Sequence, residues 1–192
     1  MMSIQLKTPI LERSYSSDEF ENMPEFDERF ELVEGRLVKK PMPTHKHSWI
    51  ADIIREHYRD FDPGKKFGQM LQEVSVELGP GNVLIPDISF WTAARRWKQA
   101  EDTAAPIPDL AIEIWSEHDW ETKKRQDEAR SKIRRYQAAG VSLIWIINSK
   151  SQTVEVYHTD PNTPLQTFKV GDELSGEEVI PGFKLKVAEI FE

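Results

Sequence analysis

Three charged side chains stand in segments whose neighbours are strongly apolar. Glu113 interrupts a run that is apolar enough for a central β-strand, and Asp87 follows Pro86 inside another apolar segment. Lys132 falls within or beside the apolar stripe of a segment with helical spacing. A buried charge costs free energy unless it is paired or binds a metal ion. Two carboxylates held together would therefore suit a divalent cation, with the amine as a neighbouring base.

Each of these residues also has a purely structural interpretation. Glu113 could lie at the margin of a sheet or pair with an arginine, and a Pro-Asp pair such as Pro86-Asp87 is ordinary turn chemistry. Lys132 could pack its stem on the core and extend its ammonium group into water. If the strands of Asp87 and Glu113 are neighbours, however, their carboxylates can stand about 5 Å apart on one face. A divalent cation between them would relieve the repulsion.

Other polar groups give weaker signals. Glu31 alternates with Phe30 and Leu32, so a surface position facing water explains it most simply, although it remains a fourth candidate. His45 and His47 have the spacing of a metal-binding pair, but without cysteine or a third nearby ligand they are weak evidence for zinc. The chain has no glycine-rich phosphate loop and no hydrolase nucleophile flanked by glycines.

The segments around these residues have the pattern of a β-α-β unit. Residues 109–115 are expected to form a central strand, residues 119–139 one long helix closed by a glycine, and residues 143–148 a second apolar strand. Strands joined in this way should lie parallel, with a right-handed crossover. Because the helix starts just after Glu113 and runs back across the sheet, Lys132 could point at the carboxylates.

The remaining segments are expected to form short helices and antiparallel strands. We expect a helix at 17–23, a hairpin with strands 29–33 and 36–40, a helix between the Thr44 cap and Pro63-Gly64, a hairpin with strands 74–78 and 83–91, and a short helix at 93–97. Strands should follow at 153–157, 165–170 and 183–187 as antiparallel extensions. The pattern predicts an α/β (α+β) fold, a mixed β-sheet core flanked by helices. Because no repeat or linker is visible, residues 1–192 are expected to form one domain.

Composition and charge limit the classes of function. The 192 residues include no cysteine, which excludes disulfide scaffolds and cysteine-based zinc modules. The longest apolar run is far shorter than the roughly 20 residues that span a bilayer, so no membrane partner is expected. No secretory signal is visible, and a cytoplasmic location is the expectation.

The net charge of −8 comes from 25 Lys and Arg against 33 Asp and Glu, but it is uneven along the chain. Residues 12–34 hold nine acids and two bases, and residues 170–192 hold six acids and two bases. Residues 121–135 hold seven bases and three acids. An acidic net charge argues against a basic nucleic-acid-binding protein. The basic centre nevertheless leaves a phosphodiester substrate open, although a solvated charged face would also explain it.

An ordered set of motifs resembles a known family. The motifs are Phe30-Glu31-Leu32-Val33-Glu34-Gly35, His47, Ile85-Pro86-Asp87-Ile88, Pro108-Asp109-Leu110-Ala111-Ile112-Glu113-Ile114-Trp115-Ser116, Lys132 with Tyr136, Gly140 and Val141, and Trp145. In this order they resemble the Uma-two family, which belongs with the PD-(D/E)xK, or restriction-endonuclease-like, nucleases. The resemblance covers about residues 17–157.

The resemblance implies a restriction-endonuclease-like fold and a metal-dependent endonuclease that hydrolyses DNA phosphodiester bonds. Asp87 and Glu113, with the carbonyl oxygen of Ile114, would hold Mg²⁺ or Mn²⁺. Lys132 would be the catalytic lysine, moved from the strand to the helix, and Glu31 an accessory acid. Lys132 would orient or deprotonate the attacking water, or neutralise the charge of the pentacovalent phosphate. Nucleases of this fold often act as dimers, so the expected partners are DNA, a divalent metal and a second copy of the chain.

One departure from the pattern makes the helix lysine essential to this hypothesis. Trp115 stands where the superfamily motif would place its lysine, so Lys132 must supply the amine. Two alternatives remain on the same fold: a catalytically silent nucleic-acid-binding module, and an oligomeric scaffold. A binding module would hold DNA with a salt-dependent affinity that does not require the carboxylates.

Overall fold

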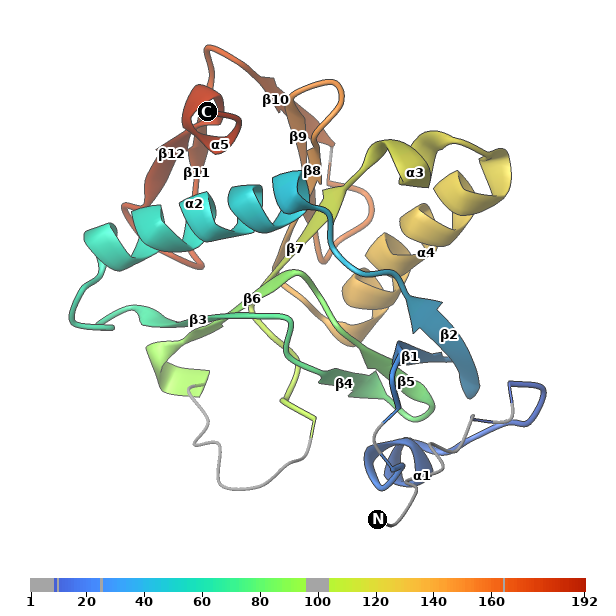
Figure 1. The fold of residues 1–192 in the computed structure, drawn as a ribbon. Helices are drawn as coiled ribbons and strands as arrows, with labels where there is room; N and C mark the ends of the chain where they lie inside the picture. Colours follow the sequence, from blue (N-terminus) through green and yellow to red (C-terminus); the bar gives the residue numbers. More distant parts are fainter. Residues whose placement is uncertain (1–8, 10, 25, 96–103, 164) are drawn as a thin grey trace, which may run out of the picture.

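The computed structural model of the chain describes residues 9, 11–24, 26–95, 104–163 and 165–192. Its largest feature is a six-stranded sheet in the order β10-β9-β8-β7-β6-β3 (Figure 1). The strands are β3 (Gly68–Gln72), β6 (Ile88–Thr92), β7 (Leu110–Trp115), β8 (Leu143–Asn148), β9 (Thr153–His158) and β10 (Gln166–Lys169). Strands β7 and β8 run parallel, and the other neighbouring pairs run antiparallel. The predicted mixed sheet and the predicted β-α-β unit are therefore confirmed.

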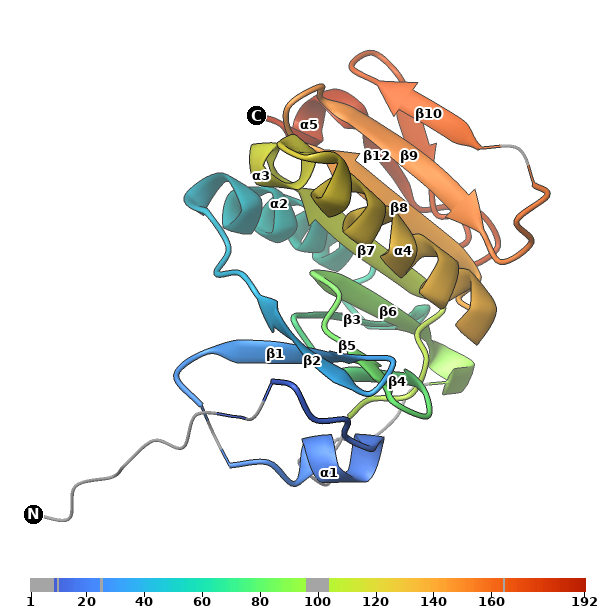
Figure 2. The ribbon, with the colours of Figure 1, turned by 90° about the vertical axis from the view of Figure 1, so that its right-hand side faces the viewer.

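Helices cover both faces of this sheet (Figure 2). Helix α2 (His45–Phe61) and the short α5 (Val187–Ile190) pack on one face, and α4 (Lys123–Ala139) packs on the other. Strand β7 is buried along its whole length, as expected for a central strand covered on both sides. Because side chains alternate along a strand, Glu113 shares the face of Ala111 and Trp115, which is the face under α4.

The predicted helix 119–139 is interrupted. Helix α3 (Glu117–Trp120) forms a separate turn, because the backbone N–H and the hydroxyl of Ser116 both donate to Asp119 Oδ2, at 2.7 and 2.8 Å. Helix α4 then starts with Thr122 as its N-cap, whose hydroxyl accepts from the backbone of Arg125. Gly140 ends α4 in the left-handed conformation, as predicted.

A second sheet lies beside the first. It has four strands in the order β2-β1-β5-β4, which are β1 (Arg29–Val33), β2 (Arg36–Lys40), β4 (Val76–Gly79) and β5 (Asn82–Leu84). The β1–β2 hairpin has the predicted bounds, and its turn residues Glu34 and Gly35 both have positive φ, at 52° and 76°. That combination matches the twist of a two-residue hairpin. Helix α1 (Ser17–Glu21) follows its predicted Ser16–Glu19 capping box and ends two residues earlier than expected.

The prediction of a single strand over residues 83–91 is wrong. Strand β5 belongs to the four-stranded sheet and β6 to the six-stranded sheet, so the chain crosses between sheets at Ile85, Pro86 and Asp87. Pro86 has no backbone N–H to contribute to a ladder, which favours the break at this point. The crossing places Asp87 between the two sheets, immediately before β6.

Several smaller elements differ from the sequence prediction. Strands β3 and β11 (Glu173–Ser175) were not predicted. Strand β12 (Lys184–Lys186) pairs with β11 in a separate two-stranded sheet, so the expectation that residues 183–187 extend the main sheet is wrong. The expected helix at 93–97 is a short 3-10 turn, η1 (Ala93–Arg95), and its last two positions lie outside the described residues. Among the described helices, none has the length and apolar character needed to span a bilayer.

Candidate active site

The four candidate side chains meet between the two sheets. Glu31 lies on β1, Asp87 just before β6, Glu113 on β7, and Lys132 in the middle of α4. The Nζ atom of Lys132 is 2.9 Å from Glu31 Oε1 and 3.4 Å from Glu113 Oε1. Asp87 joins the cluster by accepting a hydrogen bond from the backbone N–H of Ile114, next to Glu113. Residues far apart in sequence thus form one polar cluster inside an otherwise apolar region.

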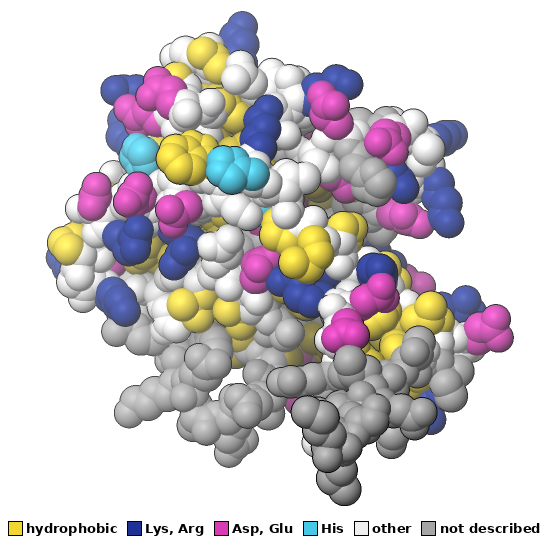
Figure 3. Space-filling view, in the orientation of Figure 1, with side chains coloured by type: hydrophobic (Ala, Val, Ile, Leu, Met, Phe, Trp, Pro, Cys, Tyr) yellow, Lys and Arg dark blue, Asp and Glu magenta, His cyan; other side chains and the backbone are white. Residues whose placement is uncertain are grey.

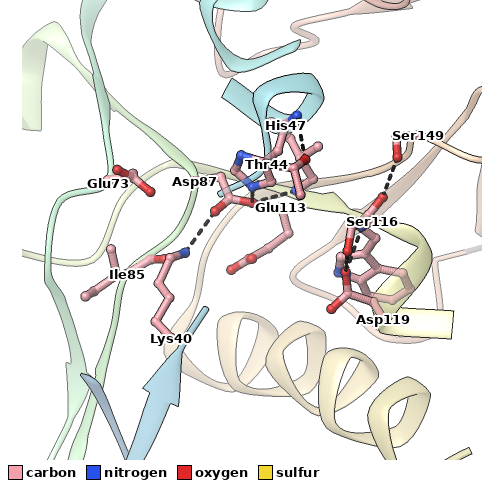
Figure 4. A network of polar contacts seen from close by, with 12 residues as sticks. Lys40, Thr44, His47, Glu73, Ile85, Asp87, Glu113, Ser116, Asp119 and Ser149 are labelled. Carbon is pink, nitrogen blue, oxygen red and sulfur yellow. Dashed lines mark hydrogen bonds and ion pairs between the residues drawn. The ribbon is translucent and has the colours of Figure 1, made fainter. Parts of the chain in front are cut away.

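Asp87 accepts from three directions and is only 3% exposed. Its Oδ2 accepts from Ile114 N–H at 2.7 Å and lies 2.9 Å from Nε2 of His47 (Figure 4). Its Oδ1 accepts from Nζ of Lys40 at 2.8 Å. Burial alone would raise the pKa of Asp87, but the Lys40 ammonium and the His47 hydrogen bond outweigh burial and hold that pKa well below its usual value. Asp87 is therefore a carboxylate at neutral pH.

Glu113 is held from α4. The hydroxyl of Tyr136 donates to Glu113 Oε1 at 2.5 Å, and Lys132, four residues earlier on the same helix face, lies beside both carboxylate oxygens. Burial raises the pKa of Glu113, the Lys132 ammonium opposes this rise, and the charge of Asp87 adds to it. Burial and the Glu113 charge raise the pKa of the Tyr136 phenol well above its usual value. Tyr136 therefore stays a neutral hydrogen-bond donor.

Lys132 and Glu31 connect the cluster to the second sheet. Burial would lower the pKa of Lys132, but the charges of Glu113, Glu31 and Asp87 raise it above its usual value. Glu31 Oε1 also accepts from the backbone N–H of Ile85 at 2.9 Å, and Glu31 as a whole is only 3% exposed. The interpretation of Glu31 as a water-facing surface residue is therefore wrong. So is the interpretation of Lys132 as a solvated lysine, because its amine lies between carboxylates.

The structure adds site residues that sequence reasoning missed. Lys40 ends β2 as a buried lysine that contacts Asp87, and Tyr136, a residue of the motif around Lys132, donates to Glu113. The sequence does not predict that Lys40 is buried, because Val38, on the same face of β2, is 44% exposed. His47, which in the sequence is only weak evidence for zinc, contacts Asp87, and His45 stacks on Trp49.

The donor set fits a hard divalent cation. Within the ranges that the structure describes, no group of three or more His, Cys, Asp or Glu side chains stands in a metal-binding arrangement. Two of the buried carboxylates, Asp87 and Glu113, are nevertheless oxygen donors of the kind that Mg²⁺ and Mn²⁺ prefer, and neighbouring backbone carbonyls can complete such a set. Three carboxylates, Asp87, Glu113 and Glu31, face the ammonium groups of Lys40 and Lys132, and the His47 ring lies 2.9 Å from Asp87.

Comparisons with known proteins agree with this fold. The family Uma2, described as "Putative restriction endonuclease", matches residues 17–188, which extends beyond the expected residues 17–157. A crystal structure described as a putative nuclease belonging to DUF820 from Anabaena variabilis ATCC 29413 is similar with a TM-score of 0.76 and 24% sequence identity. The similarity covers 92% of this chain and 97% of that chain, and at this identity it supports the fold. No curated protein sequence matches the chain.

Proposed function

Because the chain belongs to the Uma2 family, we propose that it is a metal-dependent endonuclease that hydrolyses DNA phosphodiester bonds. The family description supports a nuclease in general terms. The observation that carries the finer proposal is the cluster of Asp87, Glu113 and Lys132, which the segment before β6, strand β7 and helix α4 bring together. Keeping three charged groups in a core costs stability, which a metal-binding and catalytic role would justify.

Asp87, Glu113 and the carbonyl oxygen of Ile114 are the proposed ligands of Mg²⁺ or Mn²⁺. When bound, such a cation polarises a phosphate oxygen and makes its water more acidic. The backbone N–H of Ile114 and the ring of His47 fix the orientation of the Asp87 carboxylate. The Tyr136 hydroxyl does the same for Glu113. His47 and Tyr136 are positioning residues in this scheme.

Lys132 is the proposed catalytic amine. Its ammonium lies between Glu31 and Glu113, so it is kept charged and acts as a donor rather than as a base. A donor at this place would stabilise negative charge that develops on the phosphate oxygens. Glu31 is a positioning residue, since its carboxylate links Lys132 to the backbone that precedes Asp87.

The test combines metal binding with cleavage. We expect Mn²⁺ to raise the melting temperature of the wild-type protein and to support cleavage of a supercoiled plasmid. Asp87→Asn and Glu113→Gln should abolish both effects, while Lys132→Met should reduce cleavage by at least about 100-fold and keep the thermal response to Mn²⁺. Glu128→Gln, an exposed residue of α4, is the matched control and should behave like wild type. An unchanged melting temperature together with an intact plasmid would refute the nuclease proposal.

One observation favours the silent binding module as a second candidate. Both oxygens of Asp87 already have cationic or N–H partners within the protein, which compensate its charge without a metal. A silent module would bind DNA equally well with and without Asp87 and Glu113, and Mn²⁺ would not change its melting temperature.

For the active enzyme, a second copy of the chain is the proposed partner, because two sites are needed to cut both strands. Light scattering in solution tests whether the protein forms this dimer.

A further inference from the structure

Among the described residues of the site, Lys40 is a buried lysine that has no role in the proposed chemistry. Its Nζ atom donates to Asp87 Oδ1 at 2.8 Å and to the backbone carbonyl of Ile85 at 2.6 Å. The residue is 9% exposed, and its ammonium reaches from the end of β2 into the crossing between the sheets (Figure 4). Lys40 therefore ties the second sheet to the segment that carries the proposed metal ligand.

The contact with Oδ1 matters because the other oxygen of Asp87 is already engaged. Oδ2 accepts from the Ile114 N–H and lies beside His47, so Oδ1 is the oxygen to which a cation has the freer approach. Oxygen ligands lie about 2.1 Å from Mg²⁺. An ammonium at 2.8 Å and a divalent cation on the same oxygen would then be less than about 5 Å apart, where like charges repel. The ammonium is therefore expected to move away from Oδ1 when a cation binds there.

We propose that Lys40 is a built-in counter-cation that occupies Asp87 in the metal-free protein and must leave this carboxylate when a divalent cation binds. The proposal rests on the proposed metal-dependent function. It assigns displacement to Lys40 rather than to Lys132, since Lys132 donates at 2.9 Å to Glu31, which is not a proposed metal ligand. Glu73 is a second carboxylate near a displaced ammonium, because it already interacts electrostatically with Lys40 and lies on the same side of Asp87 as Lys40 (Figure 4), although it is paired with Arg29 at 2.8 Å.

This arrangement predicts how the removal of Lys40 changes the stability of the protein without metal and with metal. Removal of Lys40 leaves Asp87 buried without its ammonium partner, which destabilises the metal-free protein. A bound cation would restore the missing positive charge. A ligand that binds the folded state stabilises it more when its affinity is higher. Variants without Lys40 should therefore be less stable without metal, and should gain more from metal, than the wild type.

The experiment measures Mn²⁺ affinity by calorimetry and melting temperatures with and without Mn²⁺. Lys40→Met removes the charge, and Lys40→Gln removes the charge but keeps a hydrogen-bond donor, so it carries the test if the methionine variant does not fold. We expect both variants to bind Mn²⁺ at least about tenfold more tightly than wild type. Lys39→Met is the matched control, since Lys39 is the preceding residue of β2, is exposed, and pairs with Glu28; its affinity should be unchanged.

The outcomes separate this proposal from the metal-dependent function. Equal or weaker Mn²⁺ affinity in both Lys40 variants, with a wild type that binds Mn²⁺, overturns the role of Lys40 and leaves the metal site intact. Binding at least about tenfold tighter by both Lys40 variants than by a wild type that itself binds Mn²⁺ supports the displacement. If neither the wild type nor any Lys40 variant binds Mn²⁺, the metal-dependent function and the inference both fail.

Discussion

Glu113 keeps its carboxylate inside a fully buried strand because α4 supplies two donors at the right positions. Tyr136 and Lys132 are four residues apart, so both side chains leave the same helix face and reach the same carboxylate. One donor is neutral and the other is charged. Burial raises the pKa of Glu113 and the Lys132 ammonium opposes this rise, so α4 supports the charged form of the carboxylate.

The neutral donor gives a prediction on stability. Tyr136→Phe keeps the ring in the core but removes the hydroxyl from Glu113, so we expect the free energy of unfolding to fall by about 1–3 kcal/mol. Urea unfolding measures the loss. Tyr157→Phe is the matched control, because its hydroxyl also donates to a glutamate, Glu155, at 2.7 Å but in a half-buried place; its loss should be about 0.5 kcal/mol or less. If both variants lose the same free energy of unfolding, the buried Tyr136–Glu113 hydrogen bond contributes no more to stability than the half-buried Tyr157–Glu155 hydrogen bond.

Residue types in an apolar context predicted most of the candidate cluster. Asp87, Glu113 and Lys132 each break an apolar pattern, and the structure brings them together. Glu31 was not predictable as a buried residue from alternation, since its burial depends on packing between the two sheets. The burial of Lys40 was not predictable either, because both faces of β2 include exposed residues. Such residues are buried by tertiary contacts and not by local pattern.

At the scale of elements, helix ends fix the register of α4 and hence the position of Lys132. Gly140 closes the helix with φ of 89°, and nothing lies within 4 Å of the place where a Cβ would stand. A substitution there meets no clash, so its effect isolates the cost of the left-handed backbone. Left-handed conformations cost residues with a Cβ about 1–2 kcal/mol.

We therefore predict that Gly140→Ala lowers the free energy of unfolding by about 1 kcal/mol. Gly64 is the matched control, because a Cβ there also meets nothing within 4 Å but the backbone is outside the left-handed region. Gly64→Ala should be neutral or slightly stabilising, since alanine restricts the unfolded chain. Urea unfolding of the two variants gives the comparison, and a Gly140 variant as stable as wild type would contradict it.

The turn after α2 gives a prediction on pH. Asp62 accepts hydrogen bonds from the backbone N–H groups of Lys66 and Phe67 and from the hydroxyl of Tyr58. Burial acts to raise the pKa of Asp62, but the hydrogen bonds from Phe67, Lys66 and Tyr58 outweigh it and lower the pKa. An unfolded Asp titrates at about 3.9. The stabilisation is therefore complete above that pH and is lost as the pH falls through the lower folded-state pKa.

The measurement is urea unfolding of wild type and Asp62→Asn at neutral pH and at about pH 3. We expect the variant to be less stable at neutral pH by about 1–3 kcal/mol, because the charged acceptor of three donors is lost. The difference should shrink in acid. Asp60→Asn, at an exposed position of α2, should follow the wild-type curve. A difference between Asp62→Asn and wild type that is the same at both pH values would contradict the assignment.

The break of the predicted strand at residues 85–87 explains why element prediction failed where the site lies. Periodicity detects an apolar run, but it does not show that β5 and β6 belong to different sheets. Likewise, the division of residues 117–139 into two helices depends on the side chains of Ser116, Asp119 and Thr122. The long, strongly periodic elements were predicted well, and the short links that position the carboxylates were not.

At the scale of the molecule, the acidic net charge and the proposed DNA substrate must be reconciled. Figure 3 shows acidic and basic side chains interspersed over the face that carries α2, with no large area of one sign. The basic excess lies in residues 121–135, most of which form α4, the helix that also brings Lys132 to the site. If DNA binds beside the cluster, the exposed bases of α4 are the groups placed to contact its phosphates.

The salt dependence of DNA binding tests whether α4 contacts the phosphates, and it does so independently of the net charge of the protein. Lysines that contact phosphates release counterions, and each contact contributes about 0.9 to the slope of log affinity against log salt concentration. We predict that Lys123→Gln/Lys124→Gln, at two exposed positions of α4, weakens DNA binding and reduces this slope by about 1–2 in EDTA, where no cleavage occurs. Lys65→Gln/Lys66→Gln removes the same charge from another exposed pair, located in the turn between α2 and β3. The control should keep the wild-type slope, because those lysines lie away from α4. Equal reductions in both double variants would mean that overall charge, and not the α4 surface, sets the affinity for DNA.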